Sequence, residues 1–395
     1  MIRGRLRRTT VSAAAGLLAL VTAAWLWAAY RTSDDHLPPG SYEPIAEPHW
    51  EVAEGKAREI RDDALARARV WREPPVPIGR ADLTRNPGDD DPLDPTPPIR
   101  CRFLPGVTHG TTPKFDCVLP GGEVVKVKYG GSAETHAEVA ASRLLAALGF
   151  GADRMYLVPR VRCFGCPLSP FRTYQALELV RMDGAYTRRI DYAHYRDFEW
   201  PAVERRFAAA SIDTPEIKGW SLHELDKVDP GRGGSRRAQV DALRLMAAFL
   251  HHWDNKAENQ RLVCLAAPAG DRNGPCPSPF ALLHDLGSTF GPNKVNFEGW
   301  STRRLWSDAA TCELDMKDMP YGGATFGTVR IKEEGRRFLA DELRQLSEAQ
   351  IHALFTAARF PEHRSARRAG ADAASWVRAF RQKVREIADR EPCPS

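Results

Sequence analysis

Two short segments of the chain concentrate residue types that bind metal ions or transfer protons. Residues 251–259 read His-His-Trp-Asp-Asn-Lys-Ala-Glu-Asn, and a His-Asp pair follows after 24 intervening residues, at positions 284 and 285. Histidine and aspartate side chains together bind catalytic metal ions well. One hypothesis is therefore a metal-dependent phosphohydrolase, whose ligands would come from His251, His252, Asp254, His284 and Asp285.

A third segment brings lysines and carboxylates close together. The apolar stretch after a Gly-Gly turn is typical of a strand, in which Lys126 and Lys128 lie on the same face. Residues 132–148 then have the cap and the apolar spacing of a helix, with Glu134 and Glu138 one turn apart. Either glutamate can reach back toward either lysine. The sequence therefore predicts an ion pair here and leaves its members open.

The elements around the first two segments can be predicted from periodicity. A helix from about Ser235 has apolar residues at 3.6-residue spacing and leads into the 251–259 loop. Residues 262–265 are then typical of a strand, and so are residues 280–283, which lead to Asp285. The four segments occur in a fixed order: strand lysine, helix glutamate, His-x-Asp loop, Asp-x-Gly.

In this order the chain resembles the protein-kinase-like superfamily. Residues 252–259 are similar to the His-Arg-Asp-Leu-Lys-Pro-Glu-Asn catalytic loop, and Asp285-Leu286-Gly287 is similar to Asp-Phe-Gly. The nearest likeness is to atypical secretory-pathway kinases of the Golgi casein kinase type, with CotH and HipA-like kinases further off. Their helix motif is similar to residues 136–141. The resemblance implies an α+β, two-lobed fold over about residues 100–390, with a small β-rich lobe containing one helix and a mostly helical second lobe.

The resemblance also implies roles for individual residues in transfer of the γ-phosphoryl group of ATP to a hydroxyl of a protein, glycan or small molecule. Such transfer requires cations on the phosphates, metal ions, and a group that positions the nucleophile. Asp254 would be the base and Lys256 would neutralise the transferred phosphoryl group. The metal, Mg²⁺ or alternatively Mn²⁺, would be bound by Asn259 and Asp285.

The nucleotide would be held by the strand lysines. We expect Lys126 to hold the phosphates and Glu138 to hold Lys126, with Lys128 and Glu134 as alternatives. A covering loop with Gly110 and Thr111 would complete the nucleotide site, although it lacks the Gly-x-Gly-x-x-Gly pattern of kinases.

The catalytic loop departs from that of many kinases at one position. Trp253 stands where many regulated kinases have arginine, so control by a phosphorylated activation segment is not expected. A catalytically inactive pseudokinase, acting as a binding module, would keep the same fold and is the main alternative to an active kinase.

The amino-terminal segment predicts a membrane anchor. Residues 11–30 carry no charge and follow four arginines, which favours a single-pass helix with a cytoplasmic N-terminus over a cleaved signal peptide. The remainder would then be extracytoplasmic. The expected organisation is a basic segment (1–10), a signal anchor (11–30), a Pro/Asp-rich stalk with one helix (31–99), an N-lobe (100–182) and a C-lobe (183–390).

The eight cysteines fit an oxidising compartment. Cys101 and Cys117 flank one predicted hairpin and Cys264 and Cys276 another, so disulfides are expected, although the sequence does not fix their connectivity. The Cys163-x-x-Cys166 motif could instead be redox-active or half of a zinc site; a structural disulfide is the simplest interpretation.

The charge of the chain argues against a nucleic-acid partner. The formal net charge is +5 over 395 residues, and four of these positive charges are arginines within the first ten residues. The remaining chain is close to neutral and has no overall basic character that would favour nucleic acid.

Overall fold

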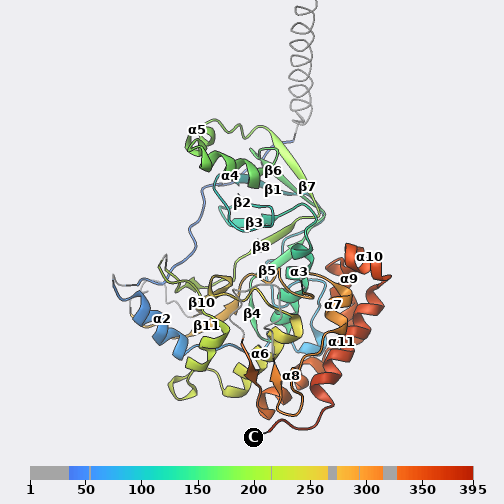
Figure 1. The fold of residues 1–395 in the computed structure, drawn as a ribbon. Helices are drawn as coiled ribbons and strands as arrows, with labels where there is room; N and C mark the ends of the chain where they lie inside the picture. Colours follow the sequence, from blue (N-terminus) through green and yellow to red (C-terminus); the bar gives the residue numbers. More distant parts are fainter. Residues whose placement is uncertain are drawn as a thin grey trace, which may run out of the picture.

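Most strands precede residue 212 and most of the long helices follow it (Figure 1). The computed structural model describes residues 35–52, 55–214, 216–265, 274–292, 294–314 and 327–394. The strands are β1 (Ile99–Leu104), β2 (Lys114–Val118), β3 (Val124–Lys128), β4 (Gly151–Ala152), β5 (Arg154–Leu157), β6 (Arg160–Phe164), β7 (Tyr195–Glu199), β8 (Ala202–Arg205), β9 (Ala210–Ser211), β10 (Gln260–Cys264), β11 (Pro279–Leu283), β12 (Glu313–Leu314) and β13 (Val329–Arg330). The helices are α2 (Ala57–Ala66), α3 (Ala133–Ala147), α4 (Pro170–Leu179), α5 (Asp183–Thr187), α6 (Arg237–Leu250), α7 (Phe297–Thr302), α8 (Glu333–Arg344), α9 (Glu348–Ala357), α10 (Arg364–Ala369) and α11 (Ala373–Ala388).

The larger sheet has seven strands in the order β5-β8-β3-β2-β1-β6-β7. Strand β3 lies between β2 and β8, and it pairs antiparallel with both. In this register Lys126 lies directly opposite Asp116 on one side and Glu204 on the other. Directly opposed side chains on adjacent strands interact, so the sheet itself brings these charges together. Two of its strands, β7 and β8, come after residue 182.

Helix α3 packs against the β5 and β8 edge of this sheet and against β4. It begins where the sequence predicts, because the Ser132 side chain caps it by accepting the backbone N–H of Glu134. It ends before Gly149, whose φ of 86° favours glycine, and a Cβ there would lie 2.2 Å from the carbonyl oxygen of Arg72. The helix is therefore fixed at both ends, and so is the position of its glutamates.

The smaller sheet has the order β4-β11-β10-β9. Strands β10 and β11 are antiparallel, and Gln260 at the start of β10 pairs with Leu283 at the end of β11. Because of this register, the loop that precedes β10 and the loop that follows β11 meet at the same end of the sheet. The segments around Asp254 and Asp285 are thereby brought together.

Helix α6 lies in the main hydrophobic core and leads into the first of these loops. Its predicted apolar positions Val240, Leu243, Ala247 and Leu250 are all buried, which confirms the predicted stripe. The helix ends at His251, whose φ of 57° turns the chain out of the helix. Helix α8 packs against α6, and α11 packs against α8. The loop is therefore carried by a helix that is covered by others.

Residues before β1 contribute to the same core. The buried side chains of Trp50, Leu65, Val70 and Leu83 belong to the main hydrophobic cluster. Arg69 and Trp71 form isolated bridges to Phe280 and Phe150. The segment expected to be a stalk thus packs against the body over much of its described length, and α2 is its one α-helix.

The predicted membrane architecture requires correction. No helix in the described ranges is both long and apolar enough to cross a membrane, and the predicted anchor, residues 11–30, lies outside those ranges. The prediction rested on the absence of charged residues over twenty positions. Such a composition permits a membrane helix but does not by itself show that one forms. The α+β class stands, whereas the single-pass membrane helix and the location derived from it are not supported. Four disulfides remain as an indication of an oxidising environment outside the cytosol.

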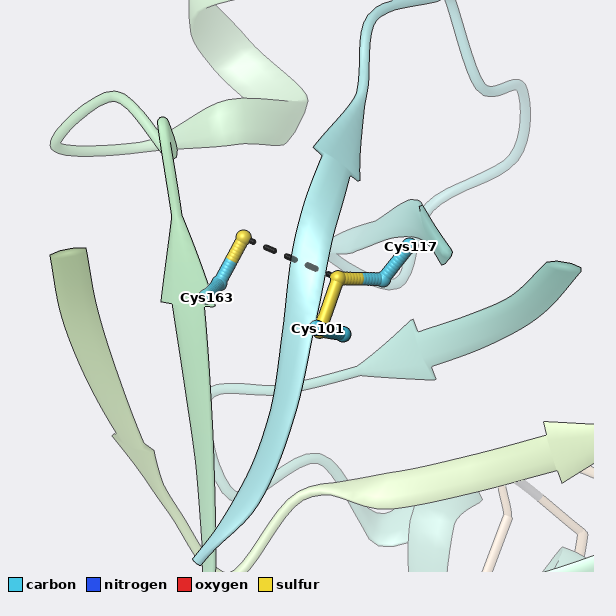
Figure 2. A group of neighbouring side chains, drawn as sticks. All are labelled: Cys101, Cys117 and Cys163. Atoms are coloured by element: carbon cyan, nitrogen blue, oxygen red, sulfur yellow. Dashed lines mark hydrogen bonds between the residues drawn. A yellow bond between two sulfur atoms is a disulfide. The ribbon is translucent and has the colours of Figure 1, made fainter. Parts of the chain in front are cut away.

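All eight cysteines are paired, as Cys101–Cys117, Cys163–Cys166, Cys264–Cys276 and Cys312–Cys393. The expectation of disulfides is confirmed, and the CxxC motif forms one of them. Figure 2 shows the Cys101–Cys117 disulfide beside Cys163, which is the partner of Cys166. The sulfurs of Cys117 and Cys163 lie 3.8 Å apart, so the two disulfides adjoin. These sulfurs are buried in the core beneath the larger sheet.

The four disulfides should contribute unequally to stability. Cys312 and Cys393 are 81 residues apart, whereas Cys163 and Cys166 are 3 residues apart. By loop entropy, replacing both members of the first pair by serine should lower the free energy of unfolding by about 4 kcal/mol, against about 1.5 kcal/mol for the second pair. Urea unfolding followed by tryptophan fluorescence measures both values. A larger loss from the Cys163–Cys166 pair would contradict the entropic explanation.

Candidate functional site

Lys128, the last residue of β3, lies at the centre of a buried cluster of charges. Its side chain is 3% exposed, and its ammonium forms an ion pair with Glu138 of α3. The same ammonium lies 3.4 Å from Glu204 of β8 and 3.9 Å from Asp285, which follows β11. The sequence favoured Lys126 as the partner of Glu138 and kept Lys128 as the alternative; the structure places Lys128 against Glu138.

Lys126 has a different partner. Its ammonium lies 3.4 Å from Glu204, the residue directly opposite it on β8. Its side chain is 20% exposed, compared with 3% for Lys128. The two lysines therefore share Glu204 but face different surroundings: Lys128 faces α3 and Asp285, and Lys126 faces a pocket.

The cluster perturbs the pKa of each of its members. Burial by itself lowers the pKa of Lys128, but the surrounding carboxylates raise it well above its usual value. Burial raises the pKa of Asp285, but Lys128 brings it well below its usual value. Burial and the charge of Asp285 raise the pKa of Glu138. Lys128 is consequently protonated and Asp285 ionised throughout the neutral range.

The backbone joins the loop before β10 to the residues after β11. The carbonyl oxygen of Asn259 accepts hydrogen bonds from the backbone N–H groups of His284 (3.0 Å) and Asp285 (3.1 Å). The side-chain amide of Asn259 donates to the carbonyl oxygen of Asp254 at 2.6 Å. Because this bond uses the nitrogen of the amide, the amide oxygen of Asn259 is left to act as an acceptor or ligand.

Asp254 lies in the same loop with a partly exposed side chain. Its carboxylate is 3.5 Å from the ammonium of Lys256, and the two side chains are 23% and 36% exposed. Burial raises the pKa of Asp254 above its usual value, with Lys256 acting in the opposite direction. This carboxylate is accessible to a small molecule, unlike Glu138 and Glu204.

His252 shapes the loop from within. It is completely buried, and burial lowers its pKa to about 4, so the imidazole is neutral. Its Nε2 lies 3.2 Å from the side-chain amide of Gln260, and its carbonyl oxygen accepts from the side chain of Asn255. These contacts give this histidine a structural role within the loop.

The other predicted nucleotide-site residues adjoin the cluster but are not the ion-pair partners of Lys128: the Glu134 side chain lies beside Gly287, and Gly110 lies beside the Lys114 ammonium. Glu134 forms an ion pair with Lys294 and accepts the hydroxyl of Thr112, and it is not among the carboxylates that contact Lys128. Gly110 and Thr111 are exposed in the loop between β1 and β2. They are thus placed on a surface loop, and no contact between that loop and Lys128 is observed among the described residues.

Sequence reasoning missed two residues of the cluster. Glu204 is 2% exposed, and its pKa is lowered to about 2 because Lys126 and Lys128 outweigh the effect of burial. Lys114 is the direct cross-strand partner of Lys128, and burial together with Lys128 lowers its pKa. The signal for Lys114 was its position in the first strand of the β2–β3 hairpin. No comparable local signal identifies Glu204.

A pocket of about 690 Å³ adjoins the cluster. One wall is formed by Lys126, Asp116 and Glu204, and another by residues 206–210, which follow β8. Residues 44–48 form a further side, and Cys264 and Leu265 also line it. The pocket thus runs from an apolar region to the charged residues beside Lys128.

The ligand set of the hydrolase hypothesis is not assembled. Within the described ranges, the groups of three potential metal ligands are Cys101, Cys117 and Cys163, which are engaged in disulfides, and Asp153, Glu204 and His284. Of the five residues of that hypothesis, only His284 belongs to either group. Its Nδ1 contacts Asp153, and the carboxylate of Asp153 also lies 3.3 Å from Arg261.

The comparisons with known proteins assign no family to this chain. No protein-family model matches the sequence, and no curated protein matches it at a significant level.

Proposed function

We propose that this chain is a protein-kinase-like phosphotransferase that moves the γ-phosphoryl group of ATP to a hydroxyl of a protein, glycan or small molecule. The observation that carries the proposal is the position of Lys128, which is ion-paired with a glutamate of α3 and lies 3.9 Å from the aspartate of Asp285-Leu286-Gly287. A buried lysine fixed by a helix glutamate and next to that aspartate is what phosphoryl transfer in kinases requires.

The lysine pair supports a phosphate-binding role in which Lys128 replaces Lys126 as the principal contact. A buried ammonium held by carboxylates loses little freedom when it binds an anion, so it serves as a preorganised cation. The adjoining pocket is large enough for part of a nucleotide, because small-molecule sites usually measure about 300–1,000 Å³. The apolar region of this pocket would take the base and the charged end would lead to the phosphates.

The residues at the end of the smaller sheet fit a hard divalent cation. The hydrogen bond from Asn259 to Asp254 is made by the amide nitrogen and does not use the amide oxygen. Asp285 is ionised, and 33% of its side chain is exposed. Amide and carboxylate oxygens are the ligands that Mg²⁺ prefers. These two residues would hold the ion, which would supply charge neutralisation on the phosphates.

Asp254 and Lys256 would act at the acceptor. Asp254 is the partly exposed carboxylate of the loop and would orient the hydroxyl and accept its proton. Lys256, 3.5 Å away, would place a positive charge beside the group being transferred. Because Lys128, Glu138 and Glu204 are buried, an acceptor would approach the site from the side of this loop.

The proposal is tested by magnesium-dependent ATP consumption by the full chain. We expect the wild type to consume ATP and Asp285→Ala to lower the rate by about 10²–10³-fold, as for loss of a major electrostatic contact in an active site. Glu298→Gln, an exposed change at the start of α7, is the matched control and should leave the rate unchanged. Thermal stabilisation of the wild type by Mg-ATP without turnover would contradict phosphotransfer and favour the pseudokinase. Turnover of phosphate esters that is indifferent to Lys128→Ala would favour a hydrolase.

A further inference from the structure

Glu204 joins the two strand lysines. Its two carboxylate oxygens are divided between them: Oε1 lies 3.4 Å from the ammonium of Lys126, and Oε2 lies 3.4 Å from that of Lys128. Glu204 is 2% exposed and Lys128 is 3% exposed, so their contact is shielded from bulk water, whereas Lys126 is 20% exposed. In a site shielded from water, the charge of a carboxylate acts strongly on its neighbours.

The register of the larger sheet fixes Glu204 in this position. Lys126 and Glu204 are direct cross-strand partners, and β8 is held on its other side by β5. The carboxylate therefore projects from a strand paired on both edges. A group carried by a rigid element of this kind positions its neighbours more accurately than a loop residue does.

The remaining side of Glu204 faces His284, whose Nδ1 lies 4.0 Å away. These two residues and Asp153 have the donor types of a metal site. However, Lys126 and Lys128 already neutralise Glu204, and Arg261 lies 3.3 Å from Asp153. The three cations make the group better suited to orienting lysines than to binding a metal.

We propose that Glu204 is a positioning residue, which holds Lys128 at the Glu138–Asp285 cluster and Lys126 in the wall of the pocket. Lys128 would then meet the phosphates while Lys126 meets a more distant part of the same ligand. The contacts of the two lysines with a nucleotide rest on the proposed function. The electrostatic effect of Glu204 on Lys126 does not depend on a ligand and can be measured without one.

Removal of the Glu204 charge should change the protonation of Lys126. The attraction of Glu204 is the largest influence on the pKa of Lys126, and it raises that pKa above the usual value despite burial. Without it, burial and the positive charge of Lys128 are left as the main influences, and both lower the pKa. The charged groups that face this pair from the surrounding elements are Lys114, Asp116, Lys128, Glu138, Asp153, His284 and Asp285.

The test is competitive acetylation of Lys126 with acetic anhydride as a function of pH, quantified by peptide mass spectrometry. Because only the neutral amine reacts, we expect the labelling midpoint in Glu204→Gln to move to lower pH by about one unit, which is about a tenfold faster reaction below the midpoint. Glu204→Asp keeps the charge and should remain close to the wild type. Glu199→Gln on β7, the far edge strand of the same sheet, is the matched surface control; Glu199 is ion-paired with Arg160.

A merely structural role would give a different result. Loosening of the sheet would raise the labelling rate at high pH, where all of the amine is neutral, without lowering the midpoint. An unchanged midpoint in Glu204→Gln would overturn the proposal. In the activity assay, Glu204→Gln should lower kcat/KM for ATP by about tenfold or more, with recovery in Glu204→Asp. If the wild type consumes no ATP, the proposed function fails, and the acetylation midpoint still decides whether Glu204 controls Lys126.

Discussion

Replacement of Lys128 by methionine should reduce magnesium-dependent ATP consumption by about 10²–10³-fold, because it removes the preorganised cation of the proposed phosphate site. Methionine keeps much of the length and volume of the lysine side chain and loses only the charge. The same change at Lys126 should have a smaller effect, since that ammonium faces the pocket and not Asp285. Steady-state rates for the two variants provide the comparison.

The Lys128 variant also loses stability, and this effect has to be separated from the catalytic one. Removing the ammonium leaves three neighbouring carboxylates without their shared cation, which for a buried pair costs about 3–5 kcal/mol. The double variant Lys128→Met with Glu138→Gln should recover part of this loss, because it removes one of the unpaired charges. Its activity should stay low. Recovery of activity together with stability would contradict the phosphate-binding role.

Replacement of Asp254 by asparagine should lower kcat by about 10²–10⁴-fold, the usual contribution of a positioned general base. The side chain is partly exposed and lies outside the buried cluster, so the free energy of unfolding and the KM for ATP should change little. Rates measured at saturating ATP, with urea unfolding in parallel, check both expectations. Equal loss of kcat in the Glu298→Gln control would show that the effect is not specific to the loop.

The pH dependence of kcat gives a second view of Asp254. Burial raises the pKa of this carboxyl, and the base must be ionised to accept a proton. We therefore expect kcat to fall as the pH drops through a pKa above the ordinary aspartate value of about 3.9. This acid limb should be absent from the residual activity of Asp254→Asn. An identical acid limb in both proteins would assign it to another group.

The parts of the site that could be predicted from sequence are those encoded locally. Residues 251–259 and 284–287 flank two short apolar strands, and an antiparallel pairing of those strands brings the two loops to one end of the sheet. The helix of Glu138 is equally local, since Ser132 and Gly149 mark its ends. Periodicity and caps were sufficient for these elements.

The choice between the two lysines depends on packing that the sequence does not encode locally. Lys126 and Lys128 lie on one face of β3. The position in which α3 packs against the sheet decides which of the two contacts Glu138. Glu204 lies 76 residues further along the chain than Lys128, after the β6 to β7 excursion, and its role depends on the pairing of β8 with β3. A cross-strand pairing between distant segments has no signature in a single sequence.

The amino-terminal prediction failed for a related reason. An uncharged run of residues and a Pro-rich composition describe what a segment is made of, not what it contacts. Trp50, Leu65 and Leu83 in the predicted stalk are buried in the main core. The membrane helix likewise has no counterpart in the described part of the chain.

The most direct test of the account is to identify the lysine that lies beside the phosphates of a bound nucleotide. An acyl-phosphate derivative of ATP transfers its acyl group to an amine near the phosphate chain, and peptide mass spectrometry locates the modified residue. The account predicts acylation of Lys128, with Lys126 as a lesser site, and loss of both when excess Mg-ATP competes. Acylation confined to exposed lysines such as Lys56 or Lys227, and unaffected by Mg-ATP, would contradict it.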